Sequence, residues 1–309
     1  MKSHQGKGRF ALQTLERRRT WNIGVSLQAS SHFEHPVTVR KLAGLQQVLL
    51  ETPYRLKILI EYDERKETVP WTPGLLDSLS PGHIDMDSLD SIIISKAGHG
   101  GDALRKIAGV IPVCCVDWFE EGRRLSRVLP DFSGGVAMAI SHLIALGHHR
   151  IAALGRPDLF AAFTEGARRG ERSASPSTPL RLEIEETGHY ARSEGAAAAR
   201  RILSRPRAEW PTALIGSDET IVGCLDVIRS MGLTVPGGIS LVTINDLRAD
   251  RVHEVPLSGI HIDYRLLGRL QAKELLRLLD DPEALGRDIP LPVEWVQRES
   301  TGPISRNRS

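Results

Sequence analysis

The stretch DFSGGVAMAISHLIALGHHRIAALGRP, residues 131–157, contains the pattern of a helix followed by a strand. Its apolar residues, beginning with Val136 and Ile140, recur at the spacing of one helix face, and Gly147 stands where a helix C-terminal cap belongs. RIAALG, residues 150–155, is then an almost continuous apolar run, which is typical of a strand buried on both faces of a parallel sheet. This unit predicts an α/β architecture.

The same alternation extends over the rest of the chain. Segments of helical period at 218–232 and 265–282 predict two further helices. By contrast, the Ser-, Pro- and Arg-rich stretch 168–181 predicts a surface loop. The other predicted strands are NIGVSL (22–27), RLKILIEY (55–62), SIIIS (91–95), PVCCVD (112–117), TALIG (212–216) and ISLVTI (239–244). Strands alternating with helices in this way predict a doubly wound fold.

Charge and cysteine content limit the function classes. The formal net charge of the 309 residues is only +2, so a nucleic-acid role would need a local basic patch, and residues 1–20 carry six Lys and Arg against the single acid Glu16. The cysteines Cys114, Cys115 and Cys224 have no CxxC spacing, which predicts buried thiols in a reducing compartment. No signal peptide and no apolar run of roughly 20 residues is present, so we expect a cytoplasmic protein without a membrane segment.

Motifs of catalysis and metal binding are missing from the sequence. It contains no GxSxG, no HExxH and no GxxxxGK phosphate loop. The adjacent His148 and His149 have no carboxylate or cysteine at ligand spacing, and His148 is interpreted as a helix-end residue. We therefore expect neither an enzyme nor a cofactor or metal site.

Five separated segments together resemble the effector-binding core of the lactose/galactose repressor (LacI/GalR) family, over about residues 21–302. The matching residues are Asp131, Gly135, Ala139, His142, Leu143, Gly147, His148, Ile151, Asp218, the run from Gly232 to Ser240, Pro256, Leu257 and Ile260. The resemblance implies a periplasmic-binding-protein-like type I fold, in which two doubly wound parallel-sheet subdomains hold a small molecule in the cleft between them.

This resemblance also implies where the subdomains begin and end. The expected parts are a basic lead at 1–20, a first subdomain of 21–128 and 258–288, a second of 129–257 and 289–303, and a tail at 304–309. The second would include the final strand LPVEWVQRES. The leucine-rich helix built on Leu266, Leu267, Leu270, Leu275 and Leu278 is interpreted as core, with a partial dimer surface as the alternative.

Candidate ligand-binding residues can be carried over from the family by position. An acid or amide can bind two sugar hydroxyls, and a flat ring can cover the apolar face of a sugar. Phe163 stands where sugar-binding relatives carry an arginine, and Asn245 where they carry an acid, so a more apolar or differently charged effector stays open. The alternative for each candidate is that it only caps a helix or ends a strand. The candidates are Asp117, Trp118, Phe163, Tyr190, Ser217, Asp218, Asn245 and Asp246.

The basic lead contains QGKGRF, which resembles the end of the wing in GntR-type winged-helix DNA readers. Its two glycines and its phenylalanine match the hairpin tip, and Lys7 and Arg9 would lie beside the phosphate backbone. A plain basic linker is the alternative. Because the first predicted strand starts near Asn22, we expect most of the DNA reader to be absent from this chain.

The resulting hypothesis is the sensor of a bacterial transcriptional regulator that works as a homodimer. A small, sugar-like effector would shift the sensor between states and so control DNA binding allosterically. The alternative is a solute-binding protein without a DNA function, and an enzyme ranks third. The identity of the effector, and whether it induces or co-represses, stays open.

Overall fold

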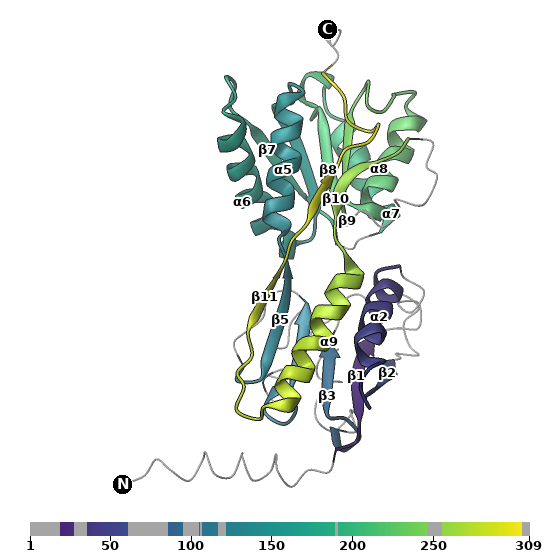
Figure 1. Cartoon of the computed structure of the whole chain (residues 1–309). Helices are drawn as coiled ribbons and strands as arrows, with labels where there is room; N and C mark the ends of the chain where they lie inside the picture. The colour runs from purple at the N-terminus through teal and green to yellow at the C-terminus, as the bar shows by residue number, and fades with distance from the viewer. Residues whose placement is uncertain are drawn as a thin grey trace. The chain divides into compact units, whose positions relative to one another are not determined.

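The computed structural model describes residues 19–27, 36–60, 86–94, 105, 107–116, 122–188, 191–245 and 255–304. The chain divides into two compact units, which are described separately below. Unit 1 consists of Met1–Pro130 and Asp263–Leu291, and unit 2 of Asp131–Ile262 and Pro292–Ser309. The chain therefore passes from one unit to the other at three points, which we call the crossings (Figure 1).

Unit 1 is built on one sheet with the strand order β11-β5-β4-β3-β1-β2, in which all pairs are parallel. Helices α2 and α9 lie side by side, and α9 packs on the central strands. The elements are β1 (Asn22–Leu27), α2 (Pro36–Leu49), β2 (Arg55–Ile60), the short 3₁₀ helix η2 (Met86–Ser88), β3 (Ser91–Ile94), β4 (Val113–Val116), β5 (Leu125–Pro130), α9 (Tyr264–Asp280) and β11 (Asp288–Leu291).

Two glycines bring α2 and α9 into backbone contact. A Cβ added at Gly44 would collide with the carbonyl oxygen of Arg265, and one added at Gly268 would collide with that of Lys41. A larger residue at either position would force the helices apart, because close-packed interiors leave no room for the added volume.

Unit 2 has a sheet of order β12-β10-β9-β8-β6-β7, parallel except for the antiparallel pair β10 and β12. Alternate residues of its strands enter different apolar clusters. Ala152 and Leu154 pack with α7 and α8, whereas Ile151 and Ala153 pack with α5 and α6. Since successive strand residues point to opposite faces, one helix pair covers each face. The elements are α5 (Phe132–Ala145), β6 (Arg150–Gly155), α6 (Pro157–Ala174), β7 (Arg181–Glu186), α7 (Arg192–Leu203), η3 (Arg207–Glu209), β8 (Ala213–Ser217), α8 (Asp218–Ser230), β9 (Ser240–Asn245), β10 (Ser258–His261) and β12 (Glu294–Val296).

The helix ends follow the sequence signals. The Asp131 carboxylate caps α5 by accepting a hydrogen bond from the Gly134 amide at 2.8 Å. Gly147 and Gly232, after α5 and α8, have φ values of +91° and +70°, in the left-handed region that glycine enters without steric cost. The predicted loop at 168–181 was wrong in its first part, because α6 continues to Ala174.

The unit boundaries differ from the sequence-based ones by two residues at the first crossing, Pro130 instead of residue 128, and by more at the other two. Residues 258–262 were assigned to the first subdomain, but β10 pairs with β9 and β12 and so belongs to unit 2. Residues 289–291 were assigned to the second, but β11 pairs with β5 in unit 1. Backbone pairing of these short strands, which their composition does not reveal, determines both changes.

The leucine-rich helix α9 is mainly core: Leu267, Leu275 and Leu278 are buried, whereas Leu266 and Leu270 are half-buried. All three cysteines are free and buried, which confirms the expected packing role of their side chains. Within the described residues, no helix combines the length and the apolar character that crossing a membrane requires.

Candidate functional site

The carboxyl ends of the unit 2 strands form the candidate site. Strands β6 to β10 run parallel, so the residues that end them lie along one edge of the sheet; these are Gly155, Glu186, Ser217, Asn245 and His261 (Figure 1). Loops at this edge of an α/β sheet can vary without disturbing the core, and ligands bind there in doubly wound folds. We call it the carboxyl edge of unit 2.

Ser217 and Asp218 lie at this edge, where β8 leads directly into α8. The Ser217 hydroxyl lies 2.8 Å from the Thr220 hydroxyl. The buried carboxylate of Asp218 accepts a hydrogen bond from the Thr243 hydroxyl. These contacts fix the start of α8 against β9, although the Ser217 side chain makes no capping hydrogen bond to an amide of α8. Ligand contact by Ser217 and Asp218 stays a prediction.

Asn245 ends β9 with a φ of +88°, a backbone conformation that asparagine tolerates better than most residues. Its Oδ1 is buried and has no hydrogen-bond partner among the residues that the structure describes. A second such atom lies on the same edge: Thr187, which follows β7, has a buried Oγ1 without a partner in the described part of the chain, while its amide donates to the Gly155 carbonyl at 3.0 Å. A buried acceptor without a donor costs about 1–3 kcal/mol, so both atoms call for a donor from water or a ligand.

Arg156 adds positive charge to the carboxyl edge. It follows β6 and precedes α6, and its side chain is only 12% exposed. Its Nε donates to the Asp158 carboxylate at 3.3 Å. Sequence reasoning sought an arginine within α6 and missed Arg156 and Thr187. Arg156 directly follows a predicted strand, which was the available signal for it, whereas Thr187 follows β7, which the sequence did not predict.

Phe163 lies in the core instead of on the surface of this edge. It has no exposed area and packs in the cluster between α5, α6 and the sheet. Its ring lies so close beneath Gly155 that a Cβ there would approach it to 2.7 Å. This burial gives Phe163 a packing role in the core, which was not predicted from the sequence, and gives no support to a more apolar ligand pocket. Contact between Phe163 and a ligand stays a prediction.

The other candidates lie outside the described residues. Strand β4 ends at Val116, directly before two of them, and β9 ends directly before another. They are Asp117, Trp118, Tyr190, Asp246 and the DNA-contact candidates Lys7 and Arg9.

His148 is a buried structural residue at the opposite, amino-terminal edge of the sheet. Its Nδ1 lies 2.8 Å from the Thr212 hydroxyl, and its Nε2 lies 3.0 Å from both the Ser240 hydroxyl and the Gly302 carbonyl oxygen. The ring thereby ties the C-terminal segment to the starts of β8 and β9. Among the residues that the structure describes, no group of three or more His, Cys, Asp or Glu could hold a metal ion.

Two units of parallel sheet and helix, joined by three crossings, are the architecture of a periplasmic binding protein-like domain. The family model with that description matches residues 140–301. The chain is 32% identical to the arabinose metabolism transcriptional repressor of Geobacillus stearothermophilus, over 97% of this chain and 82% of that protein. It is 28% identical to the lactose operon repressor of Escherichia coli, but that alignment covers 57% of this chain and only 48% of the repressor.

A similar fold occurs in a solved structure, that of a LacI family transcriptional regulator from Enterococcus faecium with bound ribose. Its TM-score is 0.72 at 20% identity, covering 92% of this chain and all of that one. The chain therefore belongs to the periplasmic binding protein-like family, as an effector-binding regulatory domain of the LacI/GalR type.

Proposed function

We propose that the chain senses a sugar-like molecule at the carboxyl edge of unit 2 and thereby controls the DNA binding of a homodimeric transcriptional regulator. The names of its relatives support this proposal: two are repressors of sugar metabolism genes, and the solved neighbour holds ribose. The proposal includes no catalytic step.

The observation that carries the proposal is the pair of buried acceptors, Thr187 Oγ1 and Asn245 Oδ1. A sugar hydroxyl donates one hydrogen bond and accepts others, so two hydroxyls of a sugar could supply the two missing donors, and one of them could accept from the guanidinium of Arg156. A site with unpaired acceptors discriminates against molecules that lack donors, because the desolvation cost then remains.

Isothermal titration calorimetry of the 309-residue protein with L-arabinose, D-ribose and cellobiose tests the proposal. Asn245→Gly keeps the left-handed backbone accessible but removes the amide, and Thr187→Val keeps the shape but removes the hydroxyl. We expect each variant to weaken binding of the best sugar about tenfold or more, the loss of one or two hydrogen bonds.

The matched control is Arg168→Gln, which removes an exposed ion pair to Glu165 on α6. It should leave the affinity unchanged. Unchanged affinity in both site variants, or the absence of binding by every sugar tested, would contradict the proposal.

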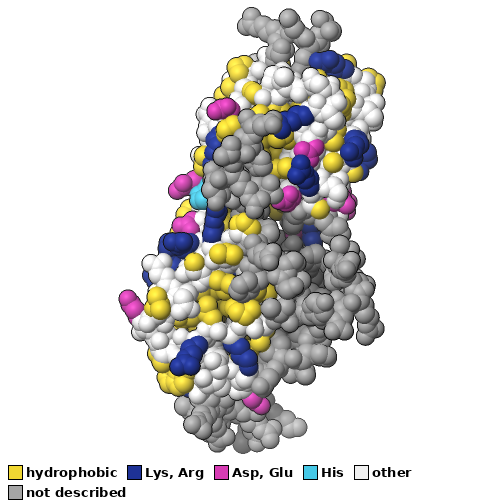
Figure 2. Space-filling view, turned by 90° about the vertical axis from the view of Figure 1, so that its right-hand side faces the viewer, with side chains coloured by type: hydrophobic (Ala, Val, Ile, Leu, Met, Phe, Trp, Pro, Cys, Tyr) yellow, Lys and Arg dark blue, Asp and Glu magenta, His cyan; other side chains and the backbone are white. Residues whose placement is uncertain are grey.

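The homodimer is supported by exposed apolar side chains in unit 1. Val39 on α2 and Leu50 directly after it are 50% and 72% exposed. Figure 2 shows hydrophobic side chains gathered on one face of this unit. Sedimentation equilibrium should give twice the chain mass, and Leu50→Lys should raise the monomer fraction. A monomer at all concentrations would exclude the dimer.

The DNA link is tested by a gel shift. The 309-residue chain alone should bind DNA weakly and without sequence preference. Tight, site-specific binding by this chain would show that it carries its own reader.

A further inference from the structure

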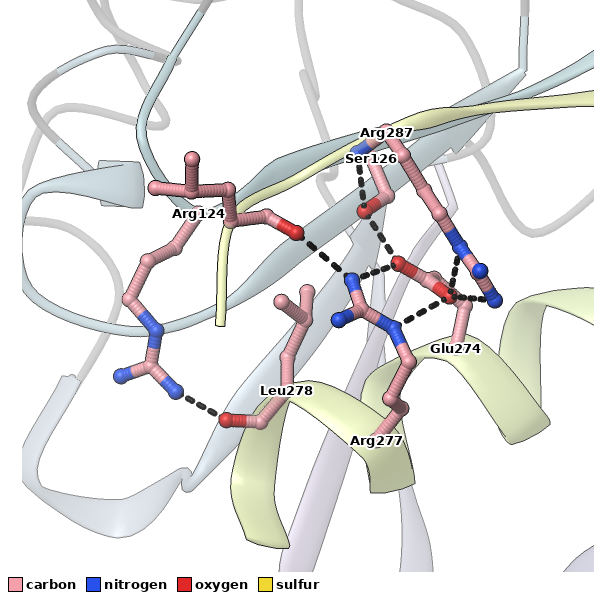
Figure 3. Close-up of polar contacts among 7 residues, drawn as sticks. Arg124, Ser126, Glu274, Arg277, Leu278 and Arg287 are labelled. Carbon is pink, nitrogen blue, oxygen red and sulfur yellow. Dashed lines mark hydrogen bonds and ion pairs between the residues drawn. The ribbon is translucent and has the colours of Figure 1, made fainter. Parts of the chain in front are cut away.

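Glu274 on α9 has a carboxylate with no exposed surface, and it is bound from three sides (Figure 3). The Ser126 hydroxyl, on β5, donates to it at 2.7 Å. Arg277, one turn further along α9, donates through Nε at 3.0 Å and Nη2 at 2.6 Å. Arg287, directly before β11, donates through Nε at 2.9 Å, and its backbone amide donates to the Ser126 hydroxyl at 3.1 Å.

These partners belong to the three segments that lead to the crossings. Strand β5 ends at Pro130, the first crossing; α9 follows the second crossing, at Asp263; and β11 ends at Leu291, the third. One carboxylate therefore holds all three connections together inside unit 1.

The charge of Glu274 is stabilised despite its burial. Burial alone would raise its pKa, but the hydrogen bonds from Arg277 and Ser126, together with the charges of Arg277 and Arg287, outweigh it and hold the pKa below its ordinary value of 4.5. Charge-assisted hydrogen bonds are stronger than neutral ones, so the three connections share a rigid contact.

The other end of α9 reaches the start of the described chain. Two arginines from different segments cap its last carbonyls: Arg124 donates to Leu278, and Arg19 donates to Leu279 at 3.4 Å. Arg19 also donates to the Tyr54 hydroxyl at 3.3 Å. Cations are favourable at a helix C-terminus.

Residues 20 and 21 are fixed by Asp90, which precedes β3. Its carboxylate accepts hydrogen bonds from the Thr20 amide at 2.9 Å, the Thr20 hydroxyl at 3.0 Å and the Trp21 amide at 2.8 Å. Trp21 has a φ of +60°, a left-handed conformation that costs a tryptophan energy. The Asp90 contacts hold it there.

We propose that Glu274 joins the three crossing segments into one rigid body, and that α9 extends this body through Arg19 to Thr20 and Trp21, at the start of the described chain. Glu274 and Arg19 are positioning residues in this path. The role of this path in controlling DNA binding rests on the proposed function. The contacts from Glu274 through α9 to Arg19 are present without sugar or DNA. The experiments below use neither, so their failure is distinguishable from failure of the proposed function.

Hydrogen–deuterium exchange of the full chain tests the first part of the proposal, that Glu274 joins the three crossing segments. In Glu274→Gln we expect amides of β5, α9 and β11 to exchange about tenfold faster together, while β1–β3 and the unit 2 sheet stay unchanged. The control is Glu283→Gln, which breaks an exposed ion pair with Arg123 in the same region. A rise confined to α9, a rise spread evenly over unit 1, or the same rise in the control overturns the proposal.

Substitutions of Arg287 test whether its positive charge near Glu274 is needed for the protection from exchange. Arg287→Gln should reproduce the faster exchange in β5 and β11, and Arg287→Lys should restore most of the protection because the positive charge remains near Glu274. Equal behaviour of the two variants would overturn the role assigned to the charge.

Trypsin cleavage after Arg19, followed by mass spectrometry, tests the second part of the proposal, that α9 extends the rigid body to Arg19. Asp90→Asn should speed this cleavage about tenfold by releasing Thr20 and Trp21. Glu274→Gln should speed it at least threefold although it contacts neither residue, and Glu283→Gln should not. A wild-type rate in Glu274→Gln would overturn the path from the crossings to Arg19.

Discussion

The two units share a strand order, with the last strand parallel in unit 1 and antiparallel in unit 2, but they differ in what they bury. In both, glycines bring a helix pair into backbone contact: Gly44 and Gly268 between α2 and α9, Gly195 and Gly223 between α7 and α8. Beneath its helix pair, unit 1 buries charged groups. Unit 2 buries a network of hydroxyls around an imidazole. The buried charged groups of unit 1 include Lys41, Asp90, Arg124 and Glu274. Unit 2 buries the Asp218 carboxylate as well as the network, which includes Thr212, Ser240 and His148.

The same strand order can therefore enclose two different kinds of buried polar groups. Between about pH 8 and 10.5 a buried lysine changes protonation, whereas hydroxyls do not titrate there and carboxylates and imidazoles ordinarily titrate at lower pH. In that pH range the stability of unit 1 should therefore depend on pH more strongly than that of unit 2.

Both units have helix pairs in contact at glycines. Substitutions of these glycines should give the largest effects on stability. Gly268→Leu in unit 1 and Gly223→Leu in unit 2 place a side chain against a backbone carbonyl, so each should lower the free energy of unfolding by about 3 kcal/mol or more. Urea denaturation followed by circular dichroism measures this. Ala43→Leu, on the exposed side of α2, is the control and should change little. If the substitution in one unit changed the free energy of unfolding only slightly, the two helix contacts would not be equivalent.

Lys41 should give the clearest difference between the units. Its burial lowers its pKa from 10.5 to about 8, partly opposed by the Coulombic effect of Cys114. The unfolded chain therefore binds more protons than the folded one between these values, and stability should rise as pH increases from about 8 to 10.5. Lys41→Met should remove this dependence and stabilise unit 1 at pH 7 by on the order of 3 kcal/mol. Thermal unfolding across this pH range measures it; a flat wild-type profile would refute the prediction.

A substitution of His148 tests how much its hydrogen-bond network contributes to the stability of unit 2. His148→Phe should cost about 2 kcal/mol, because it leaves Thr212 and the Gly302 carbonyl without this partner in the interior. Hydrogen exchange should show the loss in β8 and β9, with unit 1 unaffected. The matched control is His149→Gln, at the neighbouring, half-buried position. Equal losses in both units would count against their independence.

The smallest effect concerns the thiols, in which the units are again alike. Burial is the main cause that raises the pKa of Cys224, to about 12, and that of Cys114 well above its ordinary value. A thiol-specific chromogenic reagent at pH 8 should therefore react negligibly with the native protein and with all three cysteines in denaturant. Rapid labelling of one native cysteine would show a unit that opens readily.

The sequence allowed the buried strands and the capped helices to be predicted, because apolar runs and glycine signals are local. Strands β5, β7, β10 and β11 were missed. They are short or carry polar residues such as Ser126 and Glu183, and their neighbours come from distant parts of the chain.

Part of the candidate site was predictable for the same reason. Ser217 and Asn245 follow recognisable strands, so their place at the carboxyl edge could be inferred. Thr187 was missed along with its strand. The burial of Phe163 could have been inferred, since Gly166, Ala167 and Gly170 continue the same helix face. The contacts of Glu274 could not, because Ser126 lies far away in sequence.

The three crossings also have a consequence during synthesis. Helix α2 needs α9 as its packing partner, and the sheet of unit 1 is completed only by β11. Helix α9 leaves the ribosome about 200 residues after α2. At ordinary translation rates this is a delay of roughly 10 to 40 seconds, during which the apolar face of α2 lacks its native cover. Unit 2 can assemble most of its sheet earlier, so the half of the protein made first is expected to fold last.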